Sequence, residues 1–440
     1  MKKLLCRAFG FDNSKHSVLT ETIAGVTTFL TMAYILAVNP MIFGALKDME
    51  AGASFTATAL AAIVATLVMA FYARKPFVLA PGMGLNAFFV YTVCLGMGYS
   101  WKFALTAVFI EGVIFVILTL TKVRQSILNA IPMSLKNAIG GGIGLFIAFI
   151  GLQNAGIVVA NDATIISLGD ITCGKALLGI IGLIVTGVFV ARNVKGGILL
   201  GIAVTSVIGL FITDAATGKA LTQFSGFVSS PPSISGVFCQ FEWNHILTVD
   251  MLVVVATLLF MDMFDTMGSV IAVAHKAGYI NKKGDVESID KIFMADAIGT
   301  VAGACLGTST TTTYVESSTG VGAGGRTGLT AFTAAVCFAL ALFLAPLFLS
   351  VPGAATAPAL IIVGMMMMQP IVNIDWTDHT EALPAFITIV MMPLAYSISD
   401  GLLLGVIAYV VINAVAGRFS KLTPTMWILA VLFVLKYIFL

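Results

Sequence analysis

Charged residues are scarce in this chain. Asp, Glu, Lys and Arg make up only 10% of its 440 residues, and hydrophobic residues make up 59%. Soluble globular domains carry about 25% charged residues, so a soluble chain of this length could not bury so much apolar surface. The net charge of +2 is too small to indicate a partner, and we expect no nucleic acid to bind. The composition therefore excludes a soluble globular protein.

Residues that bind metals or form catalytic sets are few as well. The four histidines form no cluster, and the six cysteines have no metal-ligand spacing, so we interpret the cysteines as packing residues. They are Cys6, Cys94, Cys173, Cys239, Cys305 and Cys337. Because the apolar runs contain no recognisable nucleophile–base set, the sequence predicts no metal site, no cofactor and no enzyme.

Long apolar runs are what the chain has instead. Each is close to the roughly 20 residues that a helix needs to cross the hydrocarbon core of a membrane. We therefore predict an all-α polytopic membrane protein with about fourteen transmembrane helices. A last apolar run, 424–440, either crosses the membrane, lies at its interface or packs against the bundle. The predicted spans are residues 18–39, 54–73, 77–95, 101–121, 131–151, 176–193, 196–213, 249–275, 288–306, 308–323, 327–350, 353–371, 383–398 and 400–417.

The basic residues test this arrangement through the positive-inside rule. With the N-terminus in the cytoplasm, most of the 23 Lys and Arg residues fall on the cytoplasmic side. A wrong number of spans would scramble this asymmetry, so we expect a cell-membrane protein with a cytoplasmic N-terminus. The cytoplasmic set is Lys2, Lys3, Arg7, Lys15, Arg74, Lys75, Lys122, Arg124, Arg192, Lys195, Lys276, Lys282, Lys283, Lys291, Arg326, Arg418 and Lys421.

A polar connection divides the chain into two halves of seven spans each. An odd number of spans per half inverts the second half relative to the first, an arrangement that many secondary transporters use. We expect a cytoplasmic N-terminus (1–17), a first repeat (18–213), an extracytoplasmic connection (214–248), a second repeat (249–417) and a C-terminal apolar segment (418–440).

Two equivalent spans contain residues that disfavour a helix. The third carries Pro81 and Gly82 in mid-membrane, and the tenth carries the threonine-rich run 307–314. The fifth and twelfth spans both open on a proline, Pro132 and Pro352, as a repeat of seven spans requires. Non-helical backbone at membrane depth survives only inside protein or beside a wet cavity. We predict that the two breaks pair as short strands, each followed by a half-helix. Flexible kinks without a ligand are the alternative.

Five acidic residues lie within predicted spans, where each is costly and therefore usually functional. They are Glu111, Asp262, Asp265, Asp296 and Glu316. Asp262 and Asp265 are three residues apart and share roughly one helix face, and Glu316 directly follows the threonine-rich run. If the eighth and tenth spans pack together, Asp265 and Glu316 meet in mid-membrane, where paired carboxyl groups can hold and release a proton near neutral pH. We expect Glu111 and Asp296 to be packing or helix-contact residues.

These side chains predict a neutral substrate with hydrogen-bond donors. A carboxylate suits the ring N–H and exocyclic donor groups of a heterocycle, and Ser, Thr and Asn side chains suit its remaining edge. No Lys or Arg lies in mid-span beside these motifs, which disfavours an anion. We assign substrate binding to Glu316, Asp265, Asn86, Thr313 and Ser317, and proton coupling to Glu316, Asp265 and Asp262. The proton gradient is the expected energy source, with sodium as the alternative coupling ion.

Three further features have structural interpretations. The glycine-rich run 140–144 predicts close packing between helices. The acidic and aromatic stretch 375–381 predicts a solvated loop. Arg326, at the cytoplasmic end of the tenth span, is interpreted as an anchoring or gating salt-bridge residue.

Long motifs lie in several of the predicted spans. They are GVTTFLTMAY (25–34), VNP (38–40), APGMGLNAFF (80–89), FDTMG (264–268), YVESSTG (314–320), GGRTGL (324–329) and PAFIT (384–388). At these motifs the chain resembles the nucleobase:cation symporter family, in the branch that contains the adenine and guanine–hypoxanthine permeases. The resemblance runs from end to end.

The resemblance implies a uracil-transporter-like fold, with spans 1–4 and 8–11 as a core and spans 5–7 and 12–14 as a gate. It also implies a homodimer and the import of purine nucleobases by proton symport. By motif position, Asp265 and Glu316 correspond to the family's two substrate-binding acids, and Asn86 lies near the site. Ser269 departs from uracil-type members, which carry a histidine there. An uncoupled nucleobase facilitator and an anion transporter on the same fold are the alternatives, and the preferred purine stays open.

Overall fold

The computed structural model describes residues 2–12, 14, 16–121, 131–214, 218–280 and 286–439. Five basic residues of the predicted cytoplasmic set, Lys15, Lys122, Arg124, Lys282 and Lys283, lie outside the described residues. Within the described ranges the secondary structure is mainly helical, with two sheets of two strands each.

The first half follows the predicted order of spans. A short helix, α1 (Lys2–Phe9), precedes the first span, which is divided into two helices at Ala33 and Tyr34. The hairpin of β2 (Val158–Asn161) and β3 (Ile165–Leu168) joins the fifth span to the sixth. The spans are α2 (Val18–Met32) with α3 (Ile35–Phe43), α4 (Ala51–Val68) with the π-helical η1 (Met69–Ala73), β1 (Leu79–Pro81) with α5 (Met83–Ala87) and the π-helical η2 (Phe88–Gly96), α6 (Trp101–Leu120), α8 (Met133–Asn154), α9 (Gly174–Ala191) and α10 (Gly197–Ile208).

The second half repeats this order. Its spans are α11 (Val249–Ala277), α12 (Ile289–Leu306), β4 (Thr311–Thr313) with α13 (Ser317–Gly322), α14 (Gly328–Ala341) with η3 (Leu342–Leu344) and α15 (Ala345–Leu349), α16 (Gly353–Met367) with η4 (Gln369–Asn373), α17 (His379–Leu394) and α18 (Ile398–Val415). The predicted start of α17, residue 383, is too late. The side chain of Asp378 accepts a hydrogen bond of 3.1 Å from the backbone N–H of Thr380 and so begins the helix earlier.

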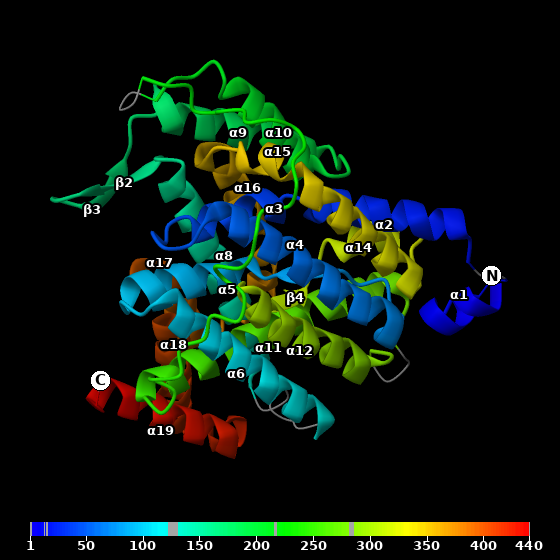
Figure 1. Cartoon of the computed structure of the whole chain (residues 1–440). Coiled ribbons are helices and arrows are strands. Elements are labelled where there is room, and N and C mark those ends of the chain that lie inside the picture. The colour runs from blue at the N-terminus through cyan, green and yellow to red at the C-terminus, as the bar shows by residue number, and fades with distance from the viewer. Residues whose placement is uncertain are drawn as a thin grey trace.

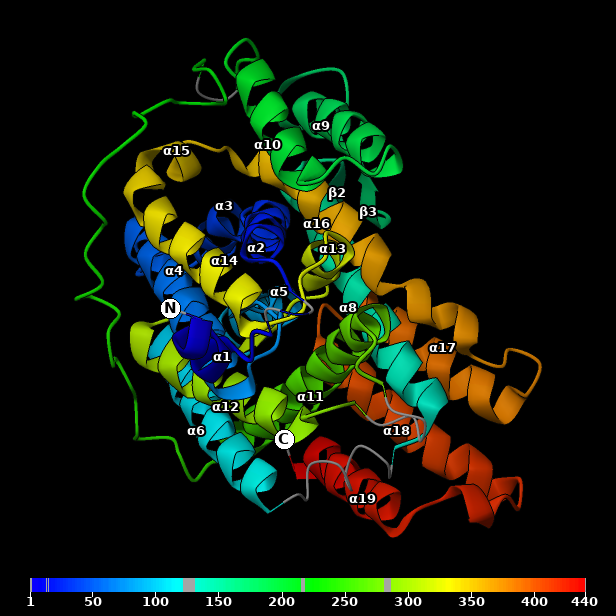
Figure 2. The same ribbon diagram turned by 90° about the vertical axis from the view of Figure 1, so that its right-hand side faces the viewer.

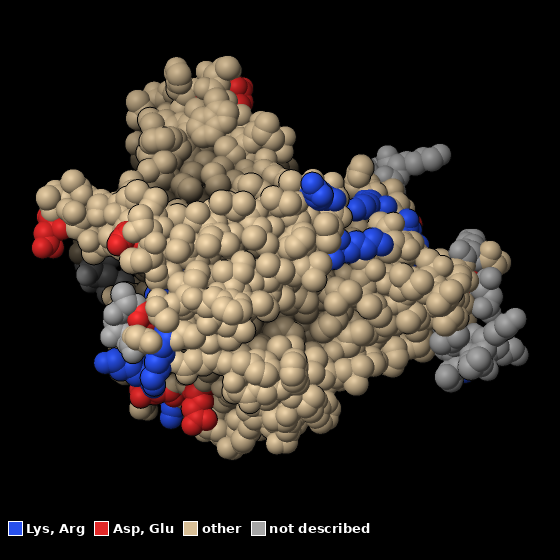
Figure 3. All heavy atoms as spheres, turned by 90° about the horizontal axis from the view of Figure 1, so that it is seen from above, with Lys and Arg blue, Asp and Glu red and all other residues tan. Residues whose placement is uncertain are grey.

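Nine helices in the described ranges are long and apolar enough to cross a membrane. Three more, Met83–Gly96, Gly197–Ile208 and His379–Leu394, are apolar but shorter. The two remaining predicted spans are the broken span of β4 and α13 and the helix α12, which carries Asp296. The face seen in Figure 3 is mostly uncharged, and its charged side chains gather in a few clusters. The structure thus confirms the predicted polytopic fold with strands in the third and tenth spans.

The helices pack in two groups. In the core group, α2 packs on α14, α4 packs on α12 and α14, and α6 packs on α11 and α12. In the gate group, α8 packs on α16 and α17, α17 packs on α18, and α9 packs on α10 and α16. Figure 2 shows the gate helices α8, α17 and α18 on one side of the molecule and the core helices α4, α6 and α12 on the other. This division matches the core and gate that the family resemblance implied.

Glycines in α8 let the gate helices approach closely, as predicted. A methyl group on Gly144 would lie 2.5 Å from the carbonyl oxygen of Gly364 in α16. A methyl group on Gly142 would lie 2.6 Å from the sulfur of Met392 in α17. A larger residue at Gly144 would force α8 and α16 apart, whereas one at Gly142 would require Met392 to move.

The terminal helix α19 (Pro424–Phe439) contacts the bundle, which was one of the three alternatives for this segment. It follows the short η5 (Phe419–Lys421) and packs against α18. Met426, Ala430 and Phe433 are buried in the main hydrophobic core. The hydroxyl of Tyr437 donates a hydrogen bond of 2.9 Å to Asp400.

Candidate substrate site

The two broken spans meet as an antiparallel pair of strands inside the core group. Figure 1 shows β4 and α5 between α4 and α11. The register places Leu79 opposite Thr313, Ala80 opposite Thr312 and Pro81 opposite Thr311. The residues of both strands are buried. The predicted pairing of the two breaks is therefore confirmed.

Two threonines satisfy the outer edges of this strand pair. The hydroxyl of Thr66 in α4 accepts a hydrogen bond from the N–H of Leu79 and donates one to its carbonyl oxygen, both at 3.1 Å. On the other edge, the hydroxyl of Thr300 in α12 donates a hydrogen bond of 3.1 Å to the carbonyl oxygen of Thr311. Lipid offers no hydrogen bonds, so a strand pair at membrane depth needs such partners from the protein.

Asp265 and Glu316 lie beside the strand pair, and both are half-buried. Asp265 in α11 accepts a hydrogen bond of 3.2 Å from the hydroxyl of Thr312. Glu316 follows β4 by three residues, at the start of α13. A methyl group added to Gly268, one helical turn beyond Asp265, would meet no atom within 4 Å, so there is open space along this face of α11.

Tyr34 is the residue of this cluster that sequence reasoning missed. It lies at the break between α2 and α3, is fully buried, and donates a hydrogen bond of 2.6 Å to Glu316. The sequence holds Tyr34 in a motif, but no glycine or proline marks the helix break that turns its hydroxyl toward the tenth span. The sequence did not reveal where the first span breaks.

Hydroxyl groups just before β4 bind two residues of the first half. Ser309 donates a hydrogen bond to the side-chain oxygen of Asn86 in α5, and Thr310 donates one of 2.6 Å to Glu111 in α6. The amide nitrogen of Asn86 and the hydroxyl of Thr313 are buried and have no hydrogen-bond partner among the described residues. Buried polar atoms of this kind are costly unless water or a ligand completes them.

Ser317, in contrast, has its hydroxyl engaged by the backbone. It is fully buried at the start of α13. Its oxygen accepts a hydrogen bond of 3.0 Å from the N–H of Val78, next to β1. The structure thus gives Ser317 a role in holding the segment that leads into the first strand.

Asp262 and Asp265 have different partners, although they are only three residues apart. The hydroxyl of Thr266 lies 3.0 Å from Asp262 and 3.0 and 3.1 Å from the two carboxylate oxygens of Asp296 in α12. A hydroxyl group has one proton, so it can donate to only one of the two carboxylates at a time. Asp262 and Asp296 are fully buried at this contact between helices.

Arg326 anchors the end of α13 without a salt bridge among the described residues. Its guanidinium donates hydrogen bonds of 2.6 and 2.7 Å to the carbonyl oxygens of Val321 and Gly325. Its backbone N–H donates one of 3.0 Å to the buried carboxylate of Glu21 in α2. Glu21 therefore ties the first span to the segment that follows the broken tenth span.

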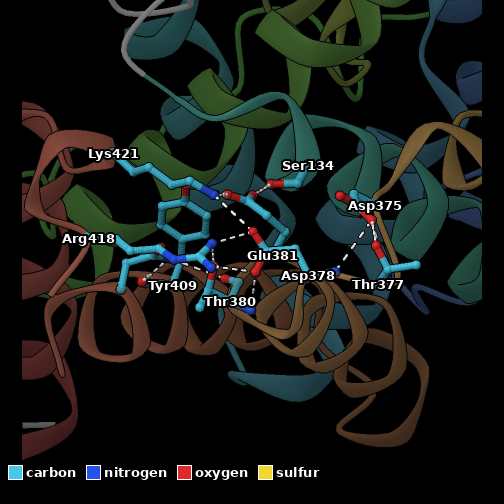
Figure 4. A network of polar contacts seen from close by, with 10 residues as sticks. Ser134, Asp375, Thr377, Asp378, Thr380, Glu381, Tyr409, Arg418 and Lys421 are labelled. Atoms are coloured by element: carbon cyan, nitrogen blue, oxygen red, sulfur yellow. Dashed lines mark hydrogen bonds and ion pairs between the residues drawn. The ribbon is translucent and has the colours of Figure 1, made fainter. Parts of the chain in front are cut away.

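A separate cluster of charged residues lies in the gate group, where α17 begins (Figure 4). Asp378 binds Arg418 and Lys421, and Glu381 accepts a hydrogen bond of 2.6 Å from Lys421. The hydrogen bond from Thr380 is the main cause that lowers the pKa of Asp378, and the two basic side chains add to it. The hydrogen bond to Glu381 raises the pKa of Lys421. The solvated loop predicted for 375–381 was therefore wrong for Asp378 and Glu381.

Solved structures share this fold. The chain matches the transmembrane domain of the cyanobacterial bicarbonate transporter BicA with a TM-score of 0.62 over 88% of this chain and 97% of that one. It matches SLC26A9 with a TM-score of 0.64 over 93% of this chain and 68% of that one. Both are 14% identical in sequence, so the likeness concerns the fold alone. The fold and the long apolar helices together define a multi-pass membrane protein.

Residues 19–404 match the model of the Permease family, and the chain belongs to this family. It is 46% identical to the guanine/hypoxanthine permease PbuG of Bacillus subtilis, over 98% of this chain and 99% of that protein. It is 42% identical to the adenine permease AdeQ of Escherichia coli, over 99% of this chain and 96% of that protein. A putative permease of Methanocaldococcus jannaschii is 47% identical, over 100% of this chain and 99% of that protein. These relatives confirm the predicted family and a transporter rather than an enzyme.

Proposed function

We propose that this chain imports purine nucleobases by proton symport with alternating access. Relatives that align with nearly the whole chain are named as adenine and as guanine/hypoxanthine permeases, which supports a purine as the cargo. Hypoxanthine, guanine and adenine share the fused ring and differ in their exocyclic groups and ring protons. A few side chains at the site would distinguish them.

The placement of Asp265 and Glu316 beside the same strand pair carries this proposal. Asp265 accepts a hydrogen bond from the hydroxyl of Thr312, and Glu316 accepts one from the hydroxyl of Tyr34. Both donors are neutral. A carboxyl group without a cationic partner in a membrane interior gains by binding a proton or the donor groups of a ligand. Proton and purine would therefore be taken up by the same pair of acids.

The remaining site residues have complementary roles. The buried, unpartnered amide nitrogen of Asn86 and the hydroxyl of Thr313 supply polar atoms for the acceptor edge of the base. Ser317 contributes indirectly, because its hydroxyl holds the segment that leads into β1. Asp262, which shares Thr266 with Asp296, is the third member of the proposed proton path.

The proposal also covers the orientation of the chain in the membrane and its oligomeric state. The N-terminus (1–17) lies in the cytoplasm, the repeats are 18–213 and 249–417, and the connection 214–248 lies outside the cell membrane. The gate group rocks against the core group. The two groups touch at contacts that include α16 with α3, α8 with α5 and α11, and α10 with α2. Two copies form a homodimer, as the family resemblance implies.

Uptake into cells tests the function directly. The chain is expressed in a strain without its own purine permeases, and radiolabelled hypoxanthine, guanine, adenine, xanthine and uracil are offered with and without a protonophore. We expect accumulation of one or two purines that the protonophore abolishes. Flat uptake of all five bases, with the protein present in the membrane, would remove the nucleobase proposal.

Two alternatives separate in the same experiment. An uncoupled facilitator would equilibrate the base and ignore the protonophore, and a sodium symporter would lose accumulation when choline replaces sodium. The anion alternative rests on the fold alone, which a bicarbonate transporter shares. Glu316 at the start of α13 opposes it, because its carboxylate would offset the helix dipole that attracts anions.

A further inference from the structure

The connection between the two halves is attached to the core group at several points. The hydroxyl of Thr56 in α4 donates a hydrogen bond of 2.9 Å to the carbonyl oxygen of Pro232. The N–H of Glu242 donates one of 2.8 Å to the hydroxyl of Thr106 in α6. The rings of Phe241 and Phe109 lie 4.9 Å apart. Residues 232–242 therefore belong to the core group rather than to a loose loop, and Figure 2 shows the connection running along that side of the molecule.

Two cysteines meet where this connection crosses the end of α12. The N–H of Cys239 donates a hydrogen bond of 2.8 Å to the carbonyl oxygen of Cys305, which places the two residues side by side. A disulfide requires Cα atoms about 4.4–6.8 Å apart, and the backbone hydrogen bond of 2.8 Å brings the two residues close together. Cys239 is exposed and Cys305 half-exposed, so both are accessible to a reagent in solution.

The surrounding contacts hold this crossing in place. Val237 of the connection is buried, and a methyl group on Gly307 would lie 2.6 Å from it, so the two segments touch without room for a side chain at Gly307. Gly307 has a φ of 94°, a left-handed value that suits glycine. From Gly307 the chain continues into the run that forms β4 of the candidate site.

We infer that Cys239 and Cys305 form a disulfide bond that fastens the connection to the end of α12. The inference rests on the proposed orientation, which places both thiols on the extracytoplasmic side, where disulfides persist. A thiolate of the pair attacks an oxidised thiol compound such as oxidised glutathione and releases one reduced molecule. The second protein thiolate then attacks the mixed disulfide and releases the other. Two protein thiols lose two protons and two electrons, and one oxidised glutathione becomes two reduced ones.

Peptide mapping tests the bond. Intact cells that express the full chain are treated with oxidised glutathione, blocked with N-ethylmaleimide, solubilised and digested for mass spectrometry. We expect a peptide pair that joins Cys239 to Cys305 and separates on reduction. The inference would be overturned if, after oxidation, both cysteines were found to carry maleimide. It would also be overturned if Cys239 alone carried glutathione. A link that forms only in permeabilised cells would overturn it as well, because the thiols would then face the cytoplasm.

Matched variants complete the test. Cys239→Ser should abolish the linked peptide, whereas Cys173→Ser, at another exposed cysteine, should leave it unchanged. Because both ends of the bond belong to the core group, oxidation should leave purine uptake within about twofold and raise the apparent Tm by on the order of 5 °C. Reversible loss of uptake on oxidation would instead mean that the connection moves against α12. The mass-spectrometric result does not depend on uptake. A failure of the disulfide inference can therefore be told apart from a failure of the transport proposal.

Discussion

The acids of the candidate site and the acids at the start of α17 have opposite kinds of partner. Asp265 and Glu316 accept hydrogen bonds from the hydroxyls of Thr312 and Tyr34. Asp378 binds Arg418 and Lys421, and Glu381 accepts a hydrogen bond from Lys421. Asp265 lies within α11 and Glu316 just before α13, whereas Asp378 and Glu381 lie at the start of α17. Among the described residues, only the second region supplies basic partners.

This difference predicts fixed charges at the start of α17 and exchangeable ones at the candidate site. A basic partner stabilises the ionised carboxylate, so Asp378 stays charged at physiological pH, in agreement with its lowered pKa. A hydroxyl partner gives no such countercharge, and a carboxyl group in a membrane interior can then exchange its proton. Four substitutions break or sharpen this comparison, from the largest expected effect on transport to the smallest.

Glu316→Gln should abolish uptake, with a loss of at least about 100-fold, because an amide can neither take a proton nor hold a charge. The measurement is initial uptake of the accumulated purine at matched expression in the membrane. Glu287→Gln is the control, since its carboxylate forms a surface ion pair of 3.4 Å with Lys75 and is 59% exposed. Uptake by the Glu316 variant at the wild-type rate would contradict its assignment.

Asp265→Asn should raise KM roughly 10-fold to 100-fold, because a hydrogen bond to a charged group contributes about 1.5–3 kcal/mol. The same uptake assay over a range of purine concentrations measures this, with a protonophore to detect uncoupling. Asp290→Asn, at an exposed position at the start of α12, serves as control. Unchanged KM together with unchanged protonophore sensitivity would exclude Asp265 from the site.

Tyr34→Phe should raise KM several-fold and shift the pH profile of uptake, because Glu316 loses its 2.6 Å hydrogen bond while the buried ring is kept. A purely structural tyrosine would change expression or stability but leave the pH profile in place. Tyr72→Phe, at a tyrosine that is 49% exposed, is the matched control and should behave as wild type.

Asp378→Asn should leave uptake nearly unchanged and lower the Tm of the purified protein at neutral pH. The pKa of Asp378 is lower in the folded protein than the ordinary value of about 3.9, so its stabilisation is present above that value and is lost as pH falls through the lower one. The difference in Tm between variant and wild type should therefore shrink below about pH 4. An equal difference at pH 7 and pH 3 would contradict this account.

The sequence predicted the breaks but not every contact that surrounds them. Pro81, Gly82 and the threonine run disfavour helix, and the equal spacing of the two breaks in the two halves indicated that they pair. The first span gave no such indication at Tyr34, because its residues are compatible with an unbroken helix. Local preference therefore identified the strands, whereas the partner of Glu316 depended on tertiary packing.

Other contacts depended on distant parts of the chain. The charges of Asp378 and Glu381 suggested a solvated loop, because their partners Arg418 and Lys421 come only after the two helices α17 and α18. Cys239 and Cys305 looked like unrelated packing residues because the path of the connection is not encoded in any periodic pattern. Side chains whose partners are remote in sequence are the ones that sequence reasoning placed least well.

The pairing of β1 with β4 has a consequence for biosynthesis. At about 5–20 residues per second, β4 leaves the ribosome on the order of 10–50 s after β1. During that interval the polar backbone of β1 has Thr66 on one edge and nothing yet made for the other. The first repeat must therefore enter the membrane with its third span unfinished, and the insertion machinery must shelter that segment until the second repeat arrives. A chain stopped after the first repeat would be a substrate for proteolysis rather than half a transporter.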